Sequence, residues 1–299
     1  MFKRQQHRVG IVEPMNNYFD SHLAKKESIL LQRCNMAYSD KEIVLVTGGN
    51  GGIGLEVARQ LARDHGQRFH VLIGCRKLPD GEAAVKQLQG EGAGEGVEAI
   101  QIDITSEESL AAAAQLVSDK FGRLDVLHAN AGIAGDKEYA GRPISEIITL
   151  TVATNAAGAA ASVEHFVPLL SKAENPRVVF MSSGAGSLKL AHDFGFVKDY
   201  PAYSVSKAAE NMVMLYYHHR FPDWKVNASN PGFRATKINN YGEGVNETPG
   251  PISEGASNAV RLTLLGRDGE SGAHTMVQAS QDEYSKTMEG KDKVVTVPW

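Results

Sequence analysis

The chain of 299 residues is 42% hydrophobic and 22% charged, which is typical of a folded globular protein and excludes a largely disordered one. Its formal net charge of −4 lacks the basic excess of proteins that coat nucleic acid. Two cysteines, Cys34 and Cys75, are too few for a disulfide framework or a four-cysteine zinc site. We therefore expect a cytoplasmic protein without a metal or nucleic-acid partner.

The first forty residues differ from the rest of the chain. They are polar and show little periodicity, apart from a short helical pattern at 22–33, and Met36 stands directly before a strand pattern. We interpret residues 1–40 as an N-terminal extension, either a disordered tail or the product of an upstream start codon. An amphipathic organelle-targeting segment is the further alternative, and the acidic residues of the extension count against it. No apolar run follows the basic residues at the start, so a secretory signal is not expected. Because residues 1–35 can bury little apolar area, their removal is expected to leave folding and activity intact.

From residue 41 the chain alternates short apolar runs with helical patterns, and we expect residues 41–299 to form one domain. The predicted strands are 43–46, 69–73, 97–102, 126–129, 177–181 and 225–228, and the predicted helices are 55–62, 82–88, 106–121, 144–170 and 202–219. Alternating strands and helices form right-handed βαβ units. The sequence therefore predicts an α/β fold of the Rossmann type, a doubly wound parallel sheet with helices on both faces. A further helix is expected to begin at residue 253, and a last strand is expected to follow residue 273.

One stretch of the predicted helix 144–170 carries no charge between Glu146 and Glu164. Several threonines and Asn155 interrupt it, whereas a membrane span needs about 20 strongly apolar residues. We interpret it as a buried helix and expect no membrane association. The long helices 144–170 and 202–219 are candidates for a contact between copies of the chain.

A glycine cluster that reads TGGNGGIG over residues 47–54 joins the first strand to the first helix. A dinucleotide pyrophosphate needs close backbone approach and free amides at a helix N-terminus, and Cβ atoms would block that approach. The alternative is a glycine-rich turn without a ligand, but a position between a buried strand and a helix is the context that favours nucleotide binding. The spacing T-G-x-x-x-G-I-G resembles the short-chain dehydrogenase/reductase family in its classical form.

The resemblance implies a Tyr-x-x-x-Lys motif, which Tyr203 and Lys207 supply. Residues four apart lie on one face of a helix, so the phenol and the ammonium point toward the same cleft. A positive charge beside a phenol stabilises the phenolate, which makes Tyr203 a usable general acid or base near neutral pH. The resemblance also implies that Lys207 binds the ribose of a nicotinamide cofactor.

Two further polar residues match the family's catalytic positions. Ser183 is the second of two serines that end a strand, and the resemblance implies that its hydroxyl holds the substrate oxygen; the alternative is that both serines cap the next turn. Asn155 lies where the family places an asparagine in a distorted helix that supports a proton-relay water; the alternative is a simple helix–helix hydrogen bond. Ser183 and Tyr203 are 20 positions apart, more than is common in the family, and the extra residues around 188–198 are expected to form a loop over the substrate cleft.

The remaining matches concern cofactor binding. Asn130-Ala131-Gly132 corresponds to the family's N-A-G element, with Ala129 where a second asparagine is usual. Asp103 follows the third strand where family members contact adenine, helix capping being the alternative. The predicted cofactor-binding residues are therefore Gly48, Asn50, Gly52, Ile53, Gly54, Arg76, Asp103, Ile104, Asn130, Ala131, Gly132, Tyr203, Lys207, Pro231, Gly232 and Thr236.

The cofactor is expected to be NADP(H). Family members that select NAD hold the ribose with an acidic residue at the end of the second strand. Here residues 70–77 read HVLIGCRK, so no carboxylate at the strand end repels the 2′-phosphate of NADP. The planar guanidinium of Arg76 offers several hydrogen-bond donors that suit this phosphate. The alternative is that Arg76 is a solvated charge at the strand end.

The C-terminal part, including Val297-Pro298-Trp299, resembles the carbonyl-reductase-like branch. The resemblance covers residues 41–299 and implies hydride transfer between a nicotinamide cofactor and a carbonyl or secondary alcohol. A nucleotide sensor on the same fold and an isomerase, epimerase or dehydratase of the family are the alternatives. Segments 134–142, 187–198 and 237–251, with Phe194, Phe196 and Tyr241, are expected to line the substrate pocket, the last segment as a long loop.

Overall fold

The computed structural model describes residues 40–242, 248–278, 290–291 and 293–299. The predicted N-terminal extension, with its short helical pattern at 22–33, therefore lies outside the described residues. So does the middle of the loop predicted at 237–251. The described part of that loop begins with a 3-10 helix, Lys237–Gly242.

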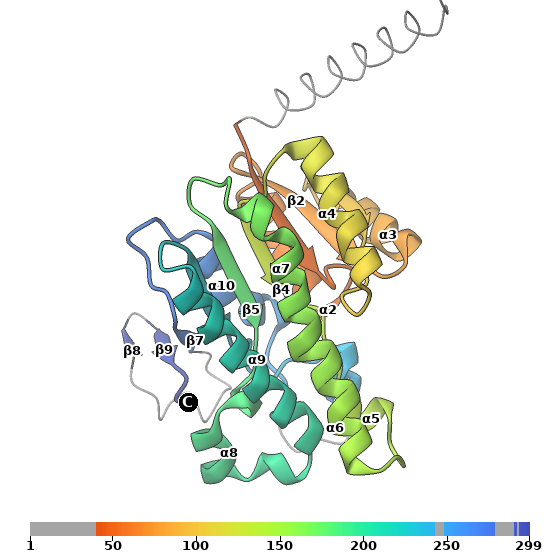
Figure 1. Ribbon diagram of the computed structural model, residues 1–299, viewed down its shortest axis with the longest axis vertical. Helices are drawn as coiled ribbons and strands as arrows, with labels where there is room; N and C mark the ends of the chain where they lie inside the picture. The colour runs from red at the N-terminus through yellow and green to blue at the C-terminus, as the bar shows by residue number, and fades with distance from the viewer. Residues whose placement is uncertain (1–39, 243–247, 279–289, 292) are drawn as a thin grey trace, which may run out of the picture.

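A single sheet carries the described strands, and its order is β3-β2-β1-β4-β5-β6-β7-β9-β8 (Figure 1). The strands are β1 (Glu42–Thr47), β2 (Phe69–Cys75), β3 (Val97–Gln101), β4 (Val126–Ala129), β5 (Arg177–Met181), β6 (Lys225–Ser229), β7 (His274–Val277), β8 (Gly290–Lys291) and β9 (Val294–Thr296). Pairs from β3 to β7 are parallel, while β9 pairs antiparallel with β7 and with β8. The predicted Rossmann-type parallel sheet is confirmed. The strand expected to be the last, β7, is followed by two more.

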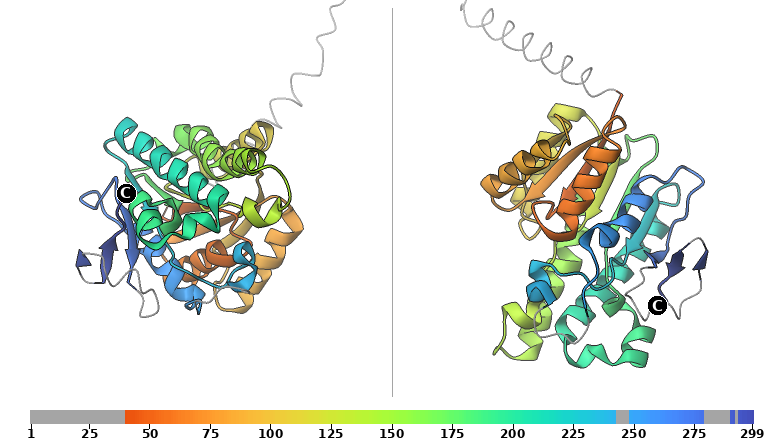
Figure 2. Two further views of the ribbon diagram at one scale, coloured as in Figure 1. Left: turned by 90° about the horizontal axis from the view of Figure 1, so that it is seen from below. Right: turned by 180° about the vertical axis from the view of Figure 1, so that it is seen from behind.

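Helices cover both faces of the sheet. They are α2 (Gly52–Asp64), α3 (Leu78–Gly90), α4 (Glu107–Phe121), α5 (Gly135–Glu138), α6 (Ile144–Val152), α7 (Ala159–Leu170), α8 (Leu188–Phe194), α9 (Pro201–Arg220) and α10 (Ile252–Thr263). Apolar residues of α4, α7 and α9 form one core cluster with the sheet, and those of α2, α3 and α10 form another. The view from behind shows α2 (orange) and α10 (blue) in front of the sheet (Figure 2). Along β1, Ile43 and Leu45 belong to the first cluster, whereas Val44 and Val46 belong to the second. This two-sided burial explains why the strand is continuously apolar.

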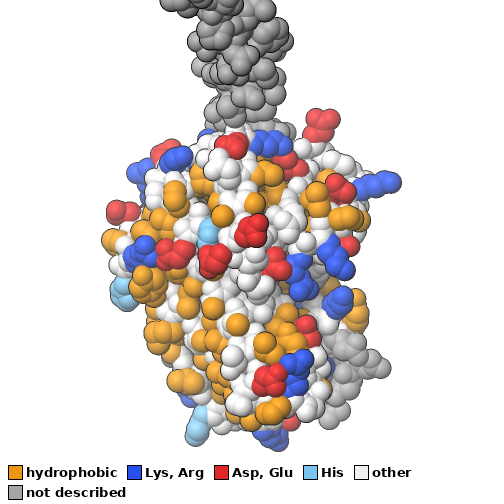
Figure 3. Space-filling view, turned by 45° about the vertical axis from the view of Figure 1, so that its right-hand side comes forward, with side chains coloured by type: hydrophobic (Ala, Val, Ile, Leu, Met, Phe, Trp, Pro, Cys, Tyr) orange, Lys and Arg blue, Asp and Glu red, His pale blue; other side chains and the backbone are white. Residues whose placement is uncertain are grey.

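The predicted helix 144–170 is continuous, but a π-helical turn at Ala153–Gly158 separates α6 from α7. Its length and mean hydropathy of 1.2 would allow a membrane span, and 33% of its most apolar window is buried. The expectation of a buried helix is therefore met on one face only. The inner face includes Ile147, Val163 and Phe166. On the face of the molecule that Figure 3 shows, acidic and basic side chains are interspersed with apolar ones.

The expectation of a loop at 188–198 is wrong, because these residues form α8 and a 3-10 turn, Phe196–Lys198. Ser187 caps the N-terminus of α8 by accepting a hydrogen bond from Leu190 N over 3.1 Å. Gly195 ends it in the left-handed conformation, with φ +68°. Both are ordinary helix boundary signals. Leu190 and Phe196 then pack against Met276, Val295 and Val297, which attaches this segment to the far edge of the sheet.

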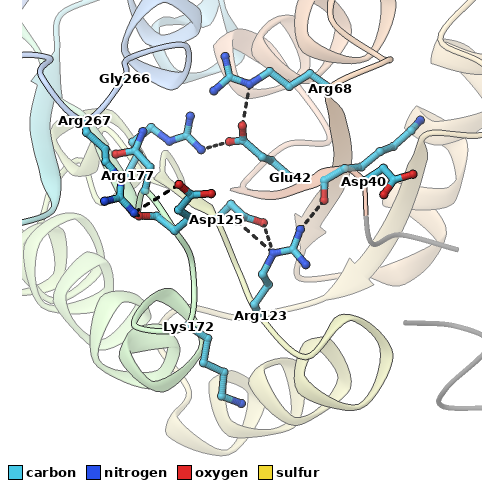
Figure 4. A pocket seen from close by; sticks show the side chains of 12 residues that line it. Asp40, Glu42, Arg68, Arg123, Asp125, Lys172, Arg177, Gly266 and Arg267 are labelled. Atoms are coloured by element: carbon cyan, nitrogen blue, oxygen red, sulfur yellow. Dashed lines mark hydrogen bonds and ion pairs between the residues drawn. The ribbon is translucent and has the colours of Figure 1, made fainter. Parts of the chain in front are cut away.

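A charged pocket of about 570 Å³ opens at the N-terminal ends of the strands (Figure 4). Glu42 pairs there with Arg68 and with Arg177, and Arg123 pairs with Asp125. Burial lowers the pKa of Arg177 to about 10. These ion pairs hold strand ends together on the edge opposite to the one where α/β sheets bind ligands. The functional site is therefore expected at the carboxyl ends of the strands.

Candidate active site

The glycine turn at residues 48–54 leaves the N-terminus of α2 open. Gly48 and Gly52 have φ of +64° and +54°, a conformation that side chains with a Cβ rarely adopt. A Cβ on Gly54 would lie 2.3 Å from Asn130 Nδ2 and 2.7 Å from the Gly48 carbonyl oxygen. Gly51 precedes the helix without a side-chain capping bond, the first turn contains no acidic residue, and a Cβ on Gly51 would meet nothing within 4 Å. An uncapped helix start beside open space fits a phosphate group.

The turn is tied to the neighbouring strand at the point where the strand order reverses between β1 and β4. Thr47 Oγ1 accepts hydrogen bonds from Asn130 N over 3.0 Å and from Ala131 N over 3.1 Å. Asn130 Nδ2 donates to the Thr47 carbonyl over 2.8 Å and to the Gly48 carbonyl over 3.3 Å. Asn130 thus shapes the turn with its side chain. The sequence motif contained Thr47, but the role of its hydroxyl became visible only in the structure.

Tyr203 and Lys207 lie on the first two turns of α9. Lys207 is 2% exposed, and its Nζ donates to the Met181 carbonyl at the end of β5 over 2.8 Å. The same atom lies 5.8 Å from the centroid of the Tyr203 ring. A Cβ built on Gly132 would lie 3.7 Å from Lys207 Nζ, so the Asn130-Ala131-Gly132 element also borders the lysine. Tyr203 is half-buried. The structure therefore brings together the two residues that the spacing placed on one helix face.

Ser183 is brought to this helix by a close contact between backbones. A Cβ on Gly186 would lie 2.7 Å from the Lys207 carbonyl oxygen, so a glycine allows the turn after β5 to touch α9. Ser182 Oγ bonds Asn211 Oδ1 over 2.6 Å, and Asn211 Nδ2 donates to the Gly186 carbonyl over 3.3 Å. Ser183 Oγ accepts from Ala185 N over 3.2 Å, as the capping alternative expected. Its own hydroxyl proton can still donate to a substrate oxygen.

Asn155 occupies the π-helical turn, and its side chain is fully engaged. Oδ1 accepts from Ile133 N over 2.8 Å, while Nδ2 donates to the Ile133 carbonyl over 2.9 Å and to Ser206 Oγ over 2.9 Å. Asn155 is 0% exposed. It therefore joins the segment after β4 to α9, one residue before Lys207, which is more than a single helix–helix hydrogen bond. Distortions of this kind are frequent at functional sites.

Asp136, on the short helix α5, is a residue that sequence reasoning did not single out. Its Oδ1 accepts from Ala202 N over 2.9 Å and its Oδ2 from Tyr203 N over 2.8 Å. The residue before α9, Tyr200, makes no side-chain capping bond of its own. A carboxylate from another element therefore caps α9 at the position of Tyr203. No local signal could have revealed this contact, since the residues are 66 and 67 positions apart.

The remaining predicted cofactor residues lie along the same edge of the sheet. Arg76 is exposed just after β2. Asp103 Oδ1 accepts from Thr105 N and Thr105 Oγ1, which lowers the pKa of Asp103, and the charge of Arg76 contributes in the same direction. The helix-capping alternative for Asp103 is wrong, because Ser106 caps α4. Elsewhere along the edge, Asn50 is exposed, Ile53, Pro231 and Gly232 are half-buried, and Ile104 and Thr236 are buried.

Other candidate groups lie in structural settings. Cys75 is buried at the end of β2, and burial raises the pKa of its thiol. His218, near the end of α9, bonds Ser271 Oγ over 3.0 Å. Among the residues that the structure describes, no three His, Cys, Asp or Glu side chains gather as metal ligands.

Comparisons with known proteins identify the class. The family model of the short chain dehydrogenases matches residues 42–244. The chain therefore belongs to the short-chain dehydrogenase/reductase family, and it is an oxidoreductase of that family. Short-chain dehydrogenase/reductase ATR10 of Stachybotrys chlorohalonatus is 49% identical over 270 residues, which cover 87% of this chain and 95% of the relative.

Two solved structures agree with the fold. Salutaridine reductase from Papaver somniferum superimposes with a TM-score of 0.65 at 25% identity, over 78% of this chain and 99% of that one. The NADPH-bound carbonyl reductase from chicken fatty liver gives a TM-score of 0.65 at 25% identity, over 78% and 95% of the two chains. Both are named as reductases.

Proposed function

We propose that this protein is an NADP(H)-dependent oxidoreductase that interconverts a carbonyl and a secondary alcohol, with Tyr203 as general acid and base. One observation carries the proposal. A half-buried tyrosine stands beside a buried lysine ammonium that is held at the carboxyl end of β5, where Ser183 follows. A phenol, a cation and a hydroxyl at one edge of the sheet are the groups that carbonyl reduction by proton transfer requires.

In reduction, Ser183 and Tyr203 donate hydrogen bonds to the carbonyl oxygen of the substrate. The nicotinamide ring, when bound, supplies the hydride to the carbonyl carbon, or accepts it in the reverse direction. As negative charge develops on the oxygen, Tyr203 transfers its proton and the alcohol forms. Donors that face the developing charge provide the main stabilisation of such a transition state.

The phenolate left on Tyr203 is stabilised by the neighbouring Lys207 ammonium, whose Nζ lies 5.8 Å from the ring centroid. Lys207 would also hold the ribose of a bound cofactor. A relay water would return a proton to the phenolate through Lys207, so that the ammonium is restored. Asn155 supports this return by fixing α9 through Ser206 and the segment after β4 through Ile133. Its π-helical turn provides the setting for a relay water.

NADP(H) is favoured over NAD(H) by the end of β2. Arg76 is exposed there, and its planar fork of donors suits the 2′-phosphate. The uncapped N-terminus of α2 would hold the pyrophosphate, with Asn50 exposed in the same turn. The structurally similar carbonyl reductase is named as NADPH-bound, which agrees with this choice.

We infer the substrate class from the segments around Tyr203. Asp136 bonds the backbone of Tyr203, and Lys137 Nζ donates to the Asn239 carbonyl over 3.4 Å, so segments 134–142 and 237–242 meet beside α9. Phe194 is 50% exposed and Tyr241 is 67% exposed, whereas Phe196 packs against an apolar cluster. Exposed aromatic surface of this kind suits a ring-bearing or medium-sized apolar ketone.

The test is a panel of ring-bearing and aliphatic carbonyl compounds assayed with NADPH and with NADH. Oxidation of NADPH that depends on one or more ketones supports the proposal, and product analysis must show the corresponding alcohol. Binding of NADPH without turnover of any compound would indicate a nucleotide sensor. A product without net change of oxidation state would indicate an isomerase, an epimerase or a dehydratase.

A further inference from the structure

The surroundings of Lys207 contain an acidic residue to which the proposed reaction assigns no role. Glu210 follows Lys207 by three positions on α9, and its Oε2 accepts a hydrogen bond from Lys207 Nζ over 2.6 Å. The side chains are 3% and 1% exposed. Two opposite charges have therefore been removed from water and paired directly.

Stability alone does not explain why an ion pair stands here. Desolvation of two ions can cost more than their attraction returns, so replacing both partners of a buried ion pair by apolar residues of similar volume is often neutral or stabilising. Glu210 Oε1 is buried and has no hydrogen-bond partner among the described residues, which adds to the cost. Burial accordingly raises the pKa of Glu210 above its ordinary value, although the charge of Lys207 and its hydrogen bond act in the opposite direction. The presence of the group calls for another reason.

The reason lies in what burial does to the lysine. Burial alone would lower the pKa of Lys207, but the negative charge of Glu210, the attraction of Tyr203 and the Glu210 hydrogen bond outweigh it, so the pKa is raised. The ammonium has three protons. One is bound to the Met181 carbonyl and one to Glu210, which leaves one for the side where Tyr203 and Gly132 lie.

We propose that Glu210 is a positioning residue whose carboxylate keeps Lys207 charged and directs its remaining proton toward Tyr203 and the ribose of the cofactor. The catalytic consequence rests on the proposed function. The pairing of Glu210 with Lys207 does not, so the two can be tested separately.

The first experiment compares Glu210→Leu with the isosteric Glu210→Gln and measures stability and function separately. Thermal unfolding without cofactor is expected to show a lower Tm for Glu210→Leu, because the change leaves the Lys207 ammonium buried and unpaired, and a smaller fall for Glu210→Gln, whose amide oxygen can still accept from Lys207 Nζ. For both variants, NADPH affinity measured by fluorescence is expected to fall about tenfold, with a larger loss of kcat on the ketone identified by the carbonyl panel. The matched control is Glu164→Gln. It removes a carboxylate that accepts hydrogen bonds from Tyr217 and Arg220, near the C-terminal end of α9. Wild-type NADPH affinity and kcat in Glu210→Leu would overturn the proposal.

The second experiment is a double-mutant cycle with Lys207→Met, read from unfolding of the protein without cofactor at pH 8 and from NADPH affinity. Residues that act through each other give non-additive effects. We expect Lys207→Met to lower the Tm, Glu210→Gln to restore part of the loss, and NADPH affinity to show no second loss in the double variant. Additive changes in both quantities would refute a role through Lys207. If the wild type binds no nicotinamide cofactor, the proposed function fails, while the Tm cycle still decides whether the two residues are coupled.

Discussion

Removal of the Asp136 carboxylate should both weaken the fold and misplace the general acid. Its two oxygens accept from Ala202 N and Tyr203 N at 2.9 and 2.8 Å, in the first turn of α9. Loss of an N-capping group costs about 0.5–2 kcal/mol, and hydrogen bonds to charged groups contribute about 1.5–3 kcal/mol. For Asp136→Ala we therefore expect the free energy of unfolding to fall by about 2–3 kcal/mol. At roughly 2–4 °C per kcal/mol, the Tm should fall by about 4–12 °C.

The kinetic effect follows from the position of Tyr203 at one of the two bonded amides. A displacement of about 1 Å at a reacting group can cost about a hundredfold in rate. We expect kcat for ketone reduction to fall by about ten- to a hundredfold, and Asp136→Asn, which keeps one acceptor oxygen, to lie between Asp136→Ala and the wild type. Asp199→Ala removes an exposed carboxylate close to the same helix end and is the control. If Asp136→Ala melts within about 1 °C of the wild type and keeps its kcat, Asp136 does not hold Tyr203 and this reasoning is wrong.

Three further changes address the acid, the cofactor preference and the glycine turn. Tyr203→Phe should lower kcat by about 10²–10⁴-fold while NADPH affinity stays near that of the wild type, and an unchanged kcat would remove Tyr203 from the mechanism. Arg76→Ala should lower the ratio of kcat/KM for NADPH over NADH by about ten- to a hundredfold, because a charge-assisted contact contributes about 1.5–3 kcal/mol; equal use of both cofactors by the wild type would contradict the assignment. Gly54→Ala should lower the Tm and weaken NADPH binding, since its Cβ would lie 2.3 Å from Asn130 Nδ2, and normal binding in this variant would show that the turn can adjust.

Much of the site could be predicted from the sequence because its signals are local. A buried strand, a glycine turn and a helix follow one another within residues 42–64, so their order alone places free amides at a helix start. Helix geometry puts residues four apart on one face, so Tyr203 and Lys207 had to share a cleft once α9 formed. The alternation of strands and helices likewise determined the parallel sheet and the edge at which these elements meet.

Other features were decided by tertiary contacts. Asp136 reaches α9 only because the segment after β4 and the start of α9 meet in space, and Asn211 meets Ser182 only because α9 packs along β5. The boundaries of α8 are set by local residues, Ser187 before it and Gly195 after it. Its attachment to the sheet depends on β7 and β9, which are distant in the sequence. Glu210 shows the difference most clearly. Its spacing from Lys207 is visible in the sequence, but an i, i+3 pair on an exposed helix face contributes little. In the folded protein both side chains are buried, and the same pair becomes a desolvated ion pair because water no longer screens its charges.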